Sequence, residues 1–257
     1  MPTPPQLTIR DDQAIRGGRR LSVEIHDGVT IPGVMLLPAW RRPAPGVLLL
    51  HGYSSRKEQM AESVGEALLA HEIASLAIDL PLHGERTDTM QAQSVRNPLA
   101  LLGQWKLAIR EATMAVHALQ HVPEIDATQL ALLGYSMGSF LGVIVAAEQP
   151  AVRAVVLAAG GDLPAQTPFA GLIRTVADPL RAVRKLAGRP LLMVHGRRDR
   201  TIQPEQAERL FAAAGEPKEL RWWDAGHYLP PPAIDDAARW LRARLIEDGA
   251  SGAAAGA

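Results

Sequence analysis

One serine, Ser136, stands in a glycine-flanked pentapeptide that could expose its hydroxyl as a nucleophile. The segment Gly134–Gly138 reads GYSMG and lies between the apolar run Leu130–Leu133 and a helix-like stretch. A sharp strand-to-helix turn strains its central residue and pushes that side chain out over the sheet edge, where side chains at the flanking glycines would collide. The helix that follows points free N–H groups and its positive dipole end toward any oxyanion formed nearby. This turn therefore favours attack on a carbonyl carbon.

A serine hydroxyl needs a base within hydrogen-bond reach, and the base needs a carboxylate that orients it. Asp199 follows the apolar run Leu191–Val194, and His227 precedes the last helical stretch. The chain order of nucleophile, acid and base matches that of hydrolases built on a parallel sheet. Asp224 is the alternative acid. The competing interpretations are a loop carboxylate paired with neighbouring arginines for Asp199 and a surface or packed histidine for His227.

Two backbone amides are predicted to stabilise the negative charge that develops on the substrate oxygen. The first is the amide of Met137, and the second is that of Tyr53, because Gly52 lets the backbone after a buried strand approach closely. His51 is interpreted as a structural histidine that holds this loop. The candidate substrate contacts are Tyr53, His83 and Tyr228.

Other side chains near these loops have structural interpretations that compete with a role in binding. The Tyr53 ring could equally be a packing residue. The segment Asp79–Arg86 could line a cleft, but its proline, glycine and charges suit a tight reversal braced by those charges. Trp222 and Trp223 are predicted to be half-buried strand residues, and Trp105 is predicted to lie in a helix core.

The hydrophobic pattern predicts the elements that position these residues. Two extended runs, Leu21–His26 and Val29–Leu37, join at Asp27-Gly28 as an antiparallel hairpin. Short apolar runs typical of buried parallel strands follow at Gly46–Leu50, Ile73–Ile78, Gln129–Leu133, Val152–Ala158 and Leu191–Val194, with a last extended run at Glu219–Trp223. Helical periodicity is clearest over Leu101–Leu119 and Ile234–Leu245, and Ser55 with Glu58 predicts a capping box.

This alternation predicts an α/β fold with a mostly parallel central sheet of about eight strands, an antiparallel N-terminal hairpin and helices on both faces. We expect a single domain over residues 1–247, with a small lid or none, for which 161–189 is the place. Residues 248–257 form an Ala/Gly tail that is expected to be disordered. Ligands should bind at the carboxyl ends of the strands.

Composition narrows the classes of protein further. The chain of 257 residues is 47% hydrophobic and carries 27 basic and 27 acidic residues, so no overall field draws it to nucleic acid or an acidic membrane, and neither is an expected partner. The first ten residues lack the regions of a signal peptide and no apolar run is long enough for a span, which predicts the cytoplasm. No cysteine, metal-binding histidine spacing or phosphate-binding loop is present, so no metal or cofactor is expected.

Taken together, His51-Gly52-Tyr53, the GYSMG turn, Asp199 and His227 resemble the α/β-hydrolase superfamily over residues 21–245. The stretch DLPLHGE at 79–85 is most similar to small bacterial esterases of the dienelactone-hydrolase and prolyl-oligopeptidase-like branch. Dienelactone hydrolases proper use a cysteine where this chain has Ser136, so the resemblance implies the fold and ester chemistry but not that substrate.

The resulting hypothesis is a serine carboxylesterase that hydrolyses small-molecule esters with short to medium acyl groups through an acyl-enzyme. An aromatic content of 4% and little room for a lid favour a small, open cleft. Two alternatives stay open. One is a peptidase or amidase that uses the same three residues, and the other is a binding protein that kept the scaffold without catalysis. The sequence does not predict an oligomeric state.

Overall fold

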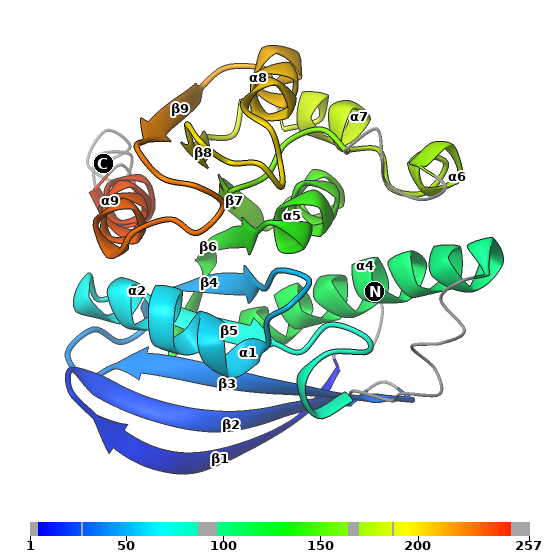
Figure 1. Ribbon diagram of the computed structural model, residues 1–257. Helices are drawn as coiled ribbons and strands as arrows, with labels where there is room; N and C mark the ends of the chain where they lie inside the picture. Colours follow the sequence, from blue (N-terminus) through cyan, green and yellow to red (C-terminus); the bar gives the residue numbers. More distant parts are fainter. Residues whose placement is uncertain (1–4, 27, 87–96, 164–169, 187, 248–257) are drawn as a thin grey trace.

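A mixed sheet runs through the part of the chain that the computed structural model describes, residues 5–26, 28–86, 97–163, 170–186 and 188–247 (Figure 1). Its strands are β1 (Gln6–Ile15), β2 (Gly18–His26), β3 (Thr30–Pro38), β4 (Ala44–Leu50), β5 (Ala74–Ile78), β6 (Ile125–Tyr135), β7 (Val152–Ala158), β8 (Leu191–Gly196) and β9 (Lys218–Trp223). Their spatial order is β1-β2-β3-β5-β4-β6-β7-β8-β9.

Strand directions divide the sheet into two parts. The pairs from β1 to β2, β2 to β3 and β3 to β5 are antiparallel, and every pair from β5 through β4 to β9 is parallel. The prediction of a mostly parallel sheet with an antiparallel N-terminal hairpin is therefore confirmed. The hydrophobic pattern does not predict β1, because this edge strand pairs on one side only and buries no continuous apolar face.

Helices cover both faces of the sheet (Figure 1). One face carries α4 (Pro98–Gln120), α5 (Met137–Glu148), α6 (Ala170–Arg174), α7 (Pro179–Arg184) and α8 (Pro204–Ala213). The other carries α1 (Lys57–Met60), a π-helical stretch η1 (Ala61–Gly65), α2 (Glu66–Ala70), α9 (Pro231–Arg242) and the π-helical turn η3 (Ala243–Glu247). A short 3₁₀ turn, η2 (Gly84–Arg86), follows β5.

The two sides of each central strand feed two separate hydrophobic clusters. In β4, Leu48 and Leu50 belong to the cluster under α4 and α5, whereas Val47 and Leu49 belong to the cluster under α1, α2 and α9. This alternation follows from the period of two along a strand, and burial on both sides explains the continuous apolar runs in the sequence.

The capping-box prediction was wrong. Helix α1 begins at Lys57, its N-cap is Arg56, and no side chain caps it. Ser55 instead lies in the loop after β4, where its amide donates to the Gly52 carbonyl, and the Glu58 carboxylate pairs with the Lys57 ammonium at 2.7 Å. The ion pair uses the carboxylate that a capping box would need.

Helix α5 is held at its carboxyl end by Arg189. One guanidinium nitrogen of this half-buried residue donates to the carbonyl oxygens of Ala146 at 2.7 Å, Gln149 at 3.1 Å and Val152 at 3.0 Å. The Ala146 carbonyl belongs to the last turn of the helix, Gln149 is the C-cap and Val152 begins β7, so the guanidinium ties the helix end to the next strand.

One segment named from the sequence is described in part and another not at all. The expected lid, 161–189, contains α6 and α7, and residues 164–169 and 187 lie outside the described residues, as does the expected tail at 248–257. The single-domain boundary and the lid stay predictions. Within the described ranges, no helix combines the length and the apolar character that a membrane crossing requires.

Candidate active site

Ser136 sits on the turn between β6 and α5, in the strained conformation expected of it. Its φ is 51° and its ψ is −115°, a region that a residue with a side chain adopts only under constraint. The neighbouring glycines are required by close packing. A Cβ at Gly134 would lie 2.2 Å from the Gly138 carbonyl oxygen, and one at Gly138 would lie 2.0 Å from the Leu50 carbonyl oxygen.

The structure brings Ser136, His227 and Asp199 together from three loops that are far apart in the sequence. The His227 Nε2 lies 2.9 Å from the Ser136 Oγ, and the His227 Nδ1 lies 2.8 Å from the Asp199 Oδ2. The other Asp199 oxygen accepts the backbone N–H groups of Thr201 at 2.8 Å and Ile202 at 3.0 Å. All three side chains thus form one chain of hydrogen bonds.

The ionisation of Asp199 sets the proton positions in this chain. Burial opposes its charge, but the hydrogen bonds from His227, Ile202 and Thr201 outweigh burial and hold the pKa of Asp199 below its usual range. A carboxylate only accepts hydrogen bonds, so the proton of the imidazole lies on Nδ1. The Nε2 of His227 is then an acceptor for the Ser136 hydroxyl proton.

Asp224, the alternative acid, makes no hydrogen bond to His227 within the described residues. Its side chain is 80% exposed and pairs with Arg198 at 3.1 Å, whereas Asp199 is 3% exposed. The structure therefore leaves Asp199 as the carboxylate that contacts the imidazole.

The loop after β4 packs directly on the nucleophile. A Cβ added to Gly52 would lie 3.3 Å from the Ser136 Cβ, so this backbone approaches the serine as closely as the sequence predicts. Among the described residues, neither the Tyr53 amide nor the Met137 amide has a hydrogen-bond acceptor within the protein. Both amides are therefore free to donate to a substrate oxygen, and their role as oxyanion donors stays a prediction.

His51 holds this loop, as its sequence position suggests. The buried ring donates from Nδ1 to the Gly52 carbonyl at 2.7 Å and accepts at Nε2 from the Leu80 amide at 3.1 Å. Burial lowers the pKa of His51 to about 4, so the ring is neutral and can both donate and accept. It links the loops after β4 and β5.

A buried ionic cluster links the same two loops at a second point. The Asp79 carboxylate accepts from the Lys57 amide at 2.9 Å, the Lys57 ammonium at 2.9 Å and the Glu85 amide at 3.0 Å. Burial opposes the charge of Lys57, but its bonds to Glu58, Glu85 and Asp79 prevail and raise its pKa. The charges of the Asp79–Arg86 segment therefore brace the loop.

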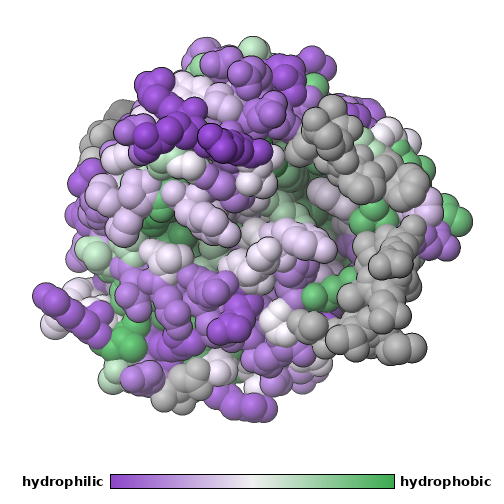
Figure 2. All heavy atoms as spheres, viewed as in Figure 1, coloured by the Kyte–Doolittle hydropathy of each residue, from purple (hydrophilic) through white to green (hydrophobic). Residues whose placement is uncertain are grey.

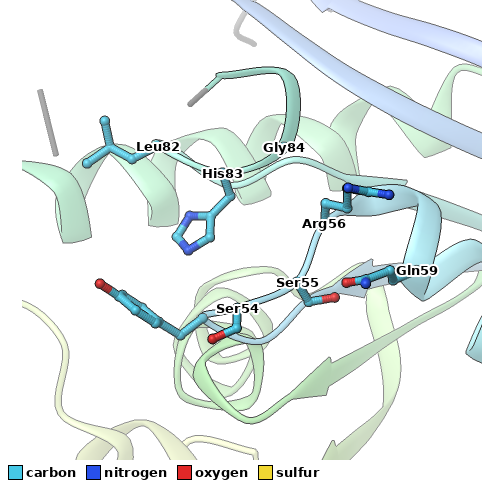
Figure 3. A pocket seen from close by; sticks show the side chains of 8 residues that line it. Ser54, Ser55, Arg56, Gln59, Leu82, His83 and Gly84 are labelled. Atoms are coloured by element: carbon cyan, nitrogen blue, oxygen red, sulfur yellow. The ribbon is translucent and has the colours of Figure 1, made fainter. Parts of the chain in front are cut away.

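A pocket of about 280 Å³ opens beside the loop after β4 (Figure 3). It is lined by Tyr53, Ser54, Ser55, Arg56, Gln59, Leu82, His83 and Gly84. His83 donates from Nδ1 to the Pro81 carbonyl, and its ring meets that of Tyr53 edge-on with centroids 5.5 Å apart. Figure 2 shows the same side of the molecule as Figure 1, hollowed near its centre, with hydrophobic residues visible in the hollow and hydrophilic residues above and below it.

The three candidate substrate contacts differ in their surroundings. Tyr53 is 73% exposed and Tyr228 is 82% exposed, and the ring of Tyr228 meets that of His227 with centroids 5.8 Å apart. Tyr53 and His83 share the pocket, whereas Tyr228 does not line it. Their roles in binding stay predictions.

Two residues that support the site were not predicted. Tyr135, next to the nucleophile, donates its hydroxyl to the His227 carbonyl at 2.8 Å and accepts the Leu229 amide at 2.9 Å. The buried ring of His195 lies 2.9 Å from the Ile202 carbonyl through Nε2, and burial lowers its pKa. The Tyr135 contact joins segments 92 residues apart, whereas the His195 contact spans seven residues of one loop. In the described part of the chain, no cluster of histidine, aspartate and glutamate side chains could hold a metal ion.

Comparison with known proteins finds a hydrolase family and proteins named as esterases. The model of the dienelactone hydrolase family matches residues 31–229. The protein named Esterase YjfP, from Escherichia coli strain K12, is 24% identical over 257 residues, which cover 88% of this chain and all of that protein.

Solved structures share the fold at low sequence identity. Acetyl xylan esterase 1 from Thermoanaerobacterium sp. JW/SL YS485 superposes with a TM-score of 0.73 at 15% identity, covering 93% of this chain and 88% of that one. A cold-adapted esterase from an Arctic intertidal metagenomic library superposes with a TM-score of 0.68 at 22% identity, covering 92% and 97%. The fold is that of the α/β-hydrolases, and the family match over most of the chain shows that this protein belongs to the dienelactone hydrolase family.

Proposed function

We propose that the protein is a serine carboxylesterase that hydrolyses esters with short to medium acyl groups. The observation that carries this proposal is the continuous chain of hydrogen bonds from Ser136 Oγ to His227 at 2.9 Å and from His227 to Asp199 at 2.8 Å. The family match and the esterase names of the relatives support the same reaction class.

In the first half of the reaction, the Ser136 Oγ attacks the acyl carbon and its proton passes to the Nε2 of His227. The carbonyl π electrons move to the oxygen, which the Tyr53 and Met137 amides stabilise in our proposal. The bond to the alcohol oxygen then breaks, and the alcohol leaves with the proton from Nε2. Asp199 holds the imidazole in place and stabilises its charged form.

In the second half, water attacks the acyl carbon of the ester on Ser136 and gives a proton to His227. The tetrahedral intermediate collapses, the Ser136 oxygen leaves with that proton, and the carboxylic acid departs. The protein returns to its starting state with one ester bond hydrolysed and one water consumed.

The preference for short acyl groups rests on the relatives, because the pocket beside the loop after β4 is lined by neither Ser136 nor His227. Two structural neighbours are named acetyl xylan esterases. Their names concern those proteins, and they favour a short acyl group here.

The test is a panel of nitrophenyl esters from acetate to laurate, run beside matched anilides and lactones. We expect the highest kcat/KM on acetate to butyrate, and a loss of about 10⁴-fold or more in the Ser136→Ala variant. Ser63→Ala, which removes an exposed hydroxyl bonded to the Gln59 carbonyl, is the matched control and should retain wild-type turnover. Hydrolysis that survives in the Ser136 variant, or turnover of anilides alone, would overturn the proposal.

A further inference from the structure

We propose that Tyr135 is a positioning residue, whose hydroxyl holds the backbone on both sides of the catalytic imidazole and so fixes His227 against Ser136. The inference rests on the proposed function, because it assigns Tyr135 a role in that reaction. It concerns the one turn residue that stands immediately before the nucleophile.

The Tyr135 hydroxyl makes two hydrogen bonds to the loop that carries His227. Tyr135 donates to the carbonyl of His227 at 2.8 Å and accepts from the amide of Leu229 at 2.9 Å. One oxygen thus clamps two backbone groups that lie two residues apart. A hydroxyl is suited to this because it is a donor and an acceptor at once.

The segment that Tyr135 clamps, residues 227–229, lacks backbone–backbone hydrogen bonds within the described part of the chain. Among the residues that the structure describes, no backbone–backbone hydrogen bond involves His227, Tyr228 or Leu229. The loop is tied before this segment, where Arg198 N–H donates to the Ala225 carbonyl, and after it α9 begins at Pro231. The stretch that carries the base therefore takes its backbone hydrogen bonds from a side chain, the Tyr135 hydroxyl, while Leu229 packs on the cluster under α9.

Tyr135 lies directly beside the nucleophile in the chain. Tyr135 is the last residue of β6 and bonds covalently to Ser136, and its half-buried ring packs on the hydrophobic cluster under α9. Its anchor therefore moves with the nucleophile. The clamp sets the distance between base and nucleophile directly, through one rigid aromatic ring.

Removing only the hydroxyl tests the clamp. In Tyr135→Phe the loop loses both bonds, and the Nε2 of His227 samples positions out of reach of the Ser136 hydroxyl. Because misplacement of a catalytic group by about 1 Å costs on the order of 10²-fold, we expect kcat to fall by about 10- to 100-fold with KM within about twofold. The rate of phosphonylation by a fluorophosphonate should fall by the same factor.

A matched control separates positioning from general loss of stability. Trp240→Phe also deletes one aromatic hydrogen-bond donor, the indole N–H that binds Glu219 at 2.6 Å, in a contact between α9 and β9. At temperatures well below both melting points, we expect this variant to keep kcat within about twofold of wild type while Tyr135→Phe does not. Equal kcat values in the two variants, or a wild-type kcat in Tyr135→Phe, would overturn the proposal.

A rescue experiment keeps the test decisive if the phenylalanine variant folds poorly. Replacing Tyr135 by 4-aminophenylalanine restores a donor at the same position, and we expect it to recover most of the lost phosphonylation rate. A stable, folded 4-aminophenylalanine variant as slow as Tyr135→Phe would contradict the clamp. Since the fluorophosphonate reports on Ser136 whatever the natural ester is, wild-type labelling without ester turnover would count against the proposed function alone.

Discussion

The nucleophile and the base are held by different kinds of force. Ser136 lies between a buried strand and a buried helix, and its position follows from backbone packing that leaves no room for a side chain at Gly134 or Gly138. His227 lies on a loop without regular structure, where the Tyr135 hydroxyl and the Asp199 carboxylate hold it by hydrogen bonds.

The two kinds of force predict different effects of substitution at the nucleophile and at the base. Changes of volume at the nucleophile turn should damage the fold, because close-packed backbone cannot give way. Changes of hydrogen-bonding capacity around the base should damage turnover first, because hydrogen bonds hold His227 and only Leu229 of residues 227–229 packs on a hydrophobic cluster. Substitutions that alter only volume or only hydrogen-bonding capacity can test this contrast between the nucleophile and the base.

The largest expected effect is on turnover, from Asp199→Asn. The amide oxygen of the new side chain can still accept from Thr201 and Ile202, which turns its NH₂ group toward the His227 Nδ1. That nitrogen must then accept, Nε2 carries the proton, and the imidazole cannot take the proton of Ser136. We expect kcat/KM to fall by about 10⁴-fold with little loss of stability.

The matched control for that variant is Asp224→Asn, at the exposed aspartate that pairs with Arg198. It should retain kcat/KM within about twofold. Steady-state ester kinetics measure both variants. A loss of kcat/KM in Asp224→Asn but not in Asp199→Asn would show that Asp224 is the acid.

The next largest effect is on stability, from Gly138→Ala. The added methyl group would meet the Leu50 carbonyl oxygen at 2.0 Å, so backbone must shift, and we expect the free energy of unfolding to fall by about 3 kcal/mol or more. Gly103→Ala in α4 has no atom within 4 Å of the new carbon and should stabilise the fold by about 0.5–1 kcal/mol. Urea unfolding measures both, and a stable Gly138→Ala protein would contradict the packing argument.

A smaller effect is expected from pH, through the loop that packs against the nucleophile. The pKa of His51 is lowered from 6.5 to about 4, so the unfolded chain binds a proton between these values and the folded chain does not. Its stabilising contribution is complete above about pH 6.5 and is lost as pH falls to 4, by on the order of 3 kcal/mol.

The variant His51→Gln isolates that contribution. Its free energy of unfolding should fall less steeply than that of wild type between pH 6.5 and 4, with part of the slope left because the pKa of His195 is lowered too. Parallel urea-derived profiles for the two proteins would show that His51 does not titrate in this way.

The fold was predictable to the extent that burial leaves a pattern. Strands β4 to β8 are buried on both faces and read as apolar runs, and the stripe along α4 has helical spacing. The edge strand β1 lacks such a pattern, and the ion pair of Glu58 with Lys57 overrode the local signal for a capping box at Ser55. The capping-box rule failed where a sequence neighbour, Lys57, competed for the same side chain.

The candidate site was predictable where function constrains local sequence. The turn around Ser136 and the loops that carry Asp199 and His227 follow strands, so their places follow from the strand order. The clamp from Tyr135 to the His227 loop spans 92 residues of sequence, and no spacing rule relates these two positions. Contacts of this kind depend on packing and need coordinates.

Arg189, at the far end of α5, has a consequence for the electric potential at Ser136. A twelve-residue helix is about 18 Å long, and the half negative charge at its carboxyl end would oppose an anion at its amino end by about 0.5 kcal/mol at an effective dielectric constant of about 20. The guanidinium that binds the Ala146, Gln149 and Val152 carbonyls cancels that opposing pole. The positive amino end of α5 at Ser136 is then no longer opposed by the negative carboxyl end. The distant Arg189 guanidinium therefore makes a small favourable contribution to the stability of an anion at the serine.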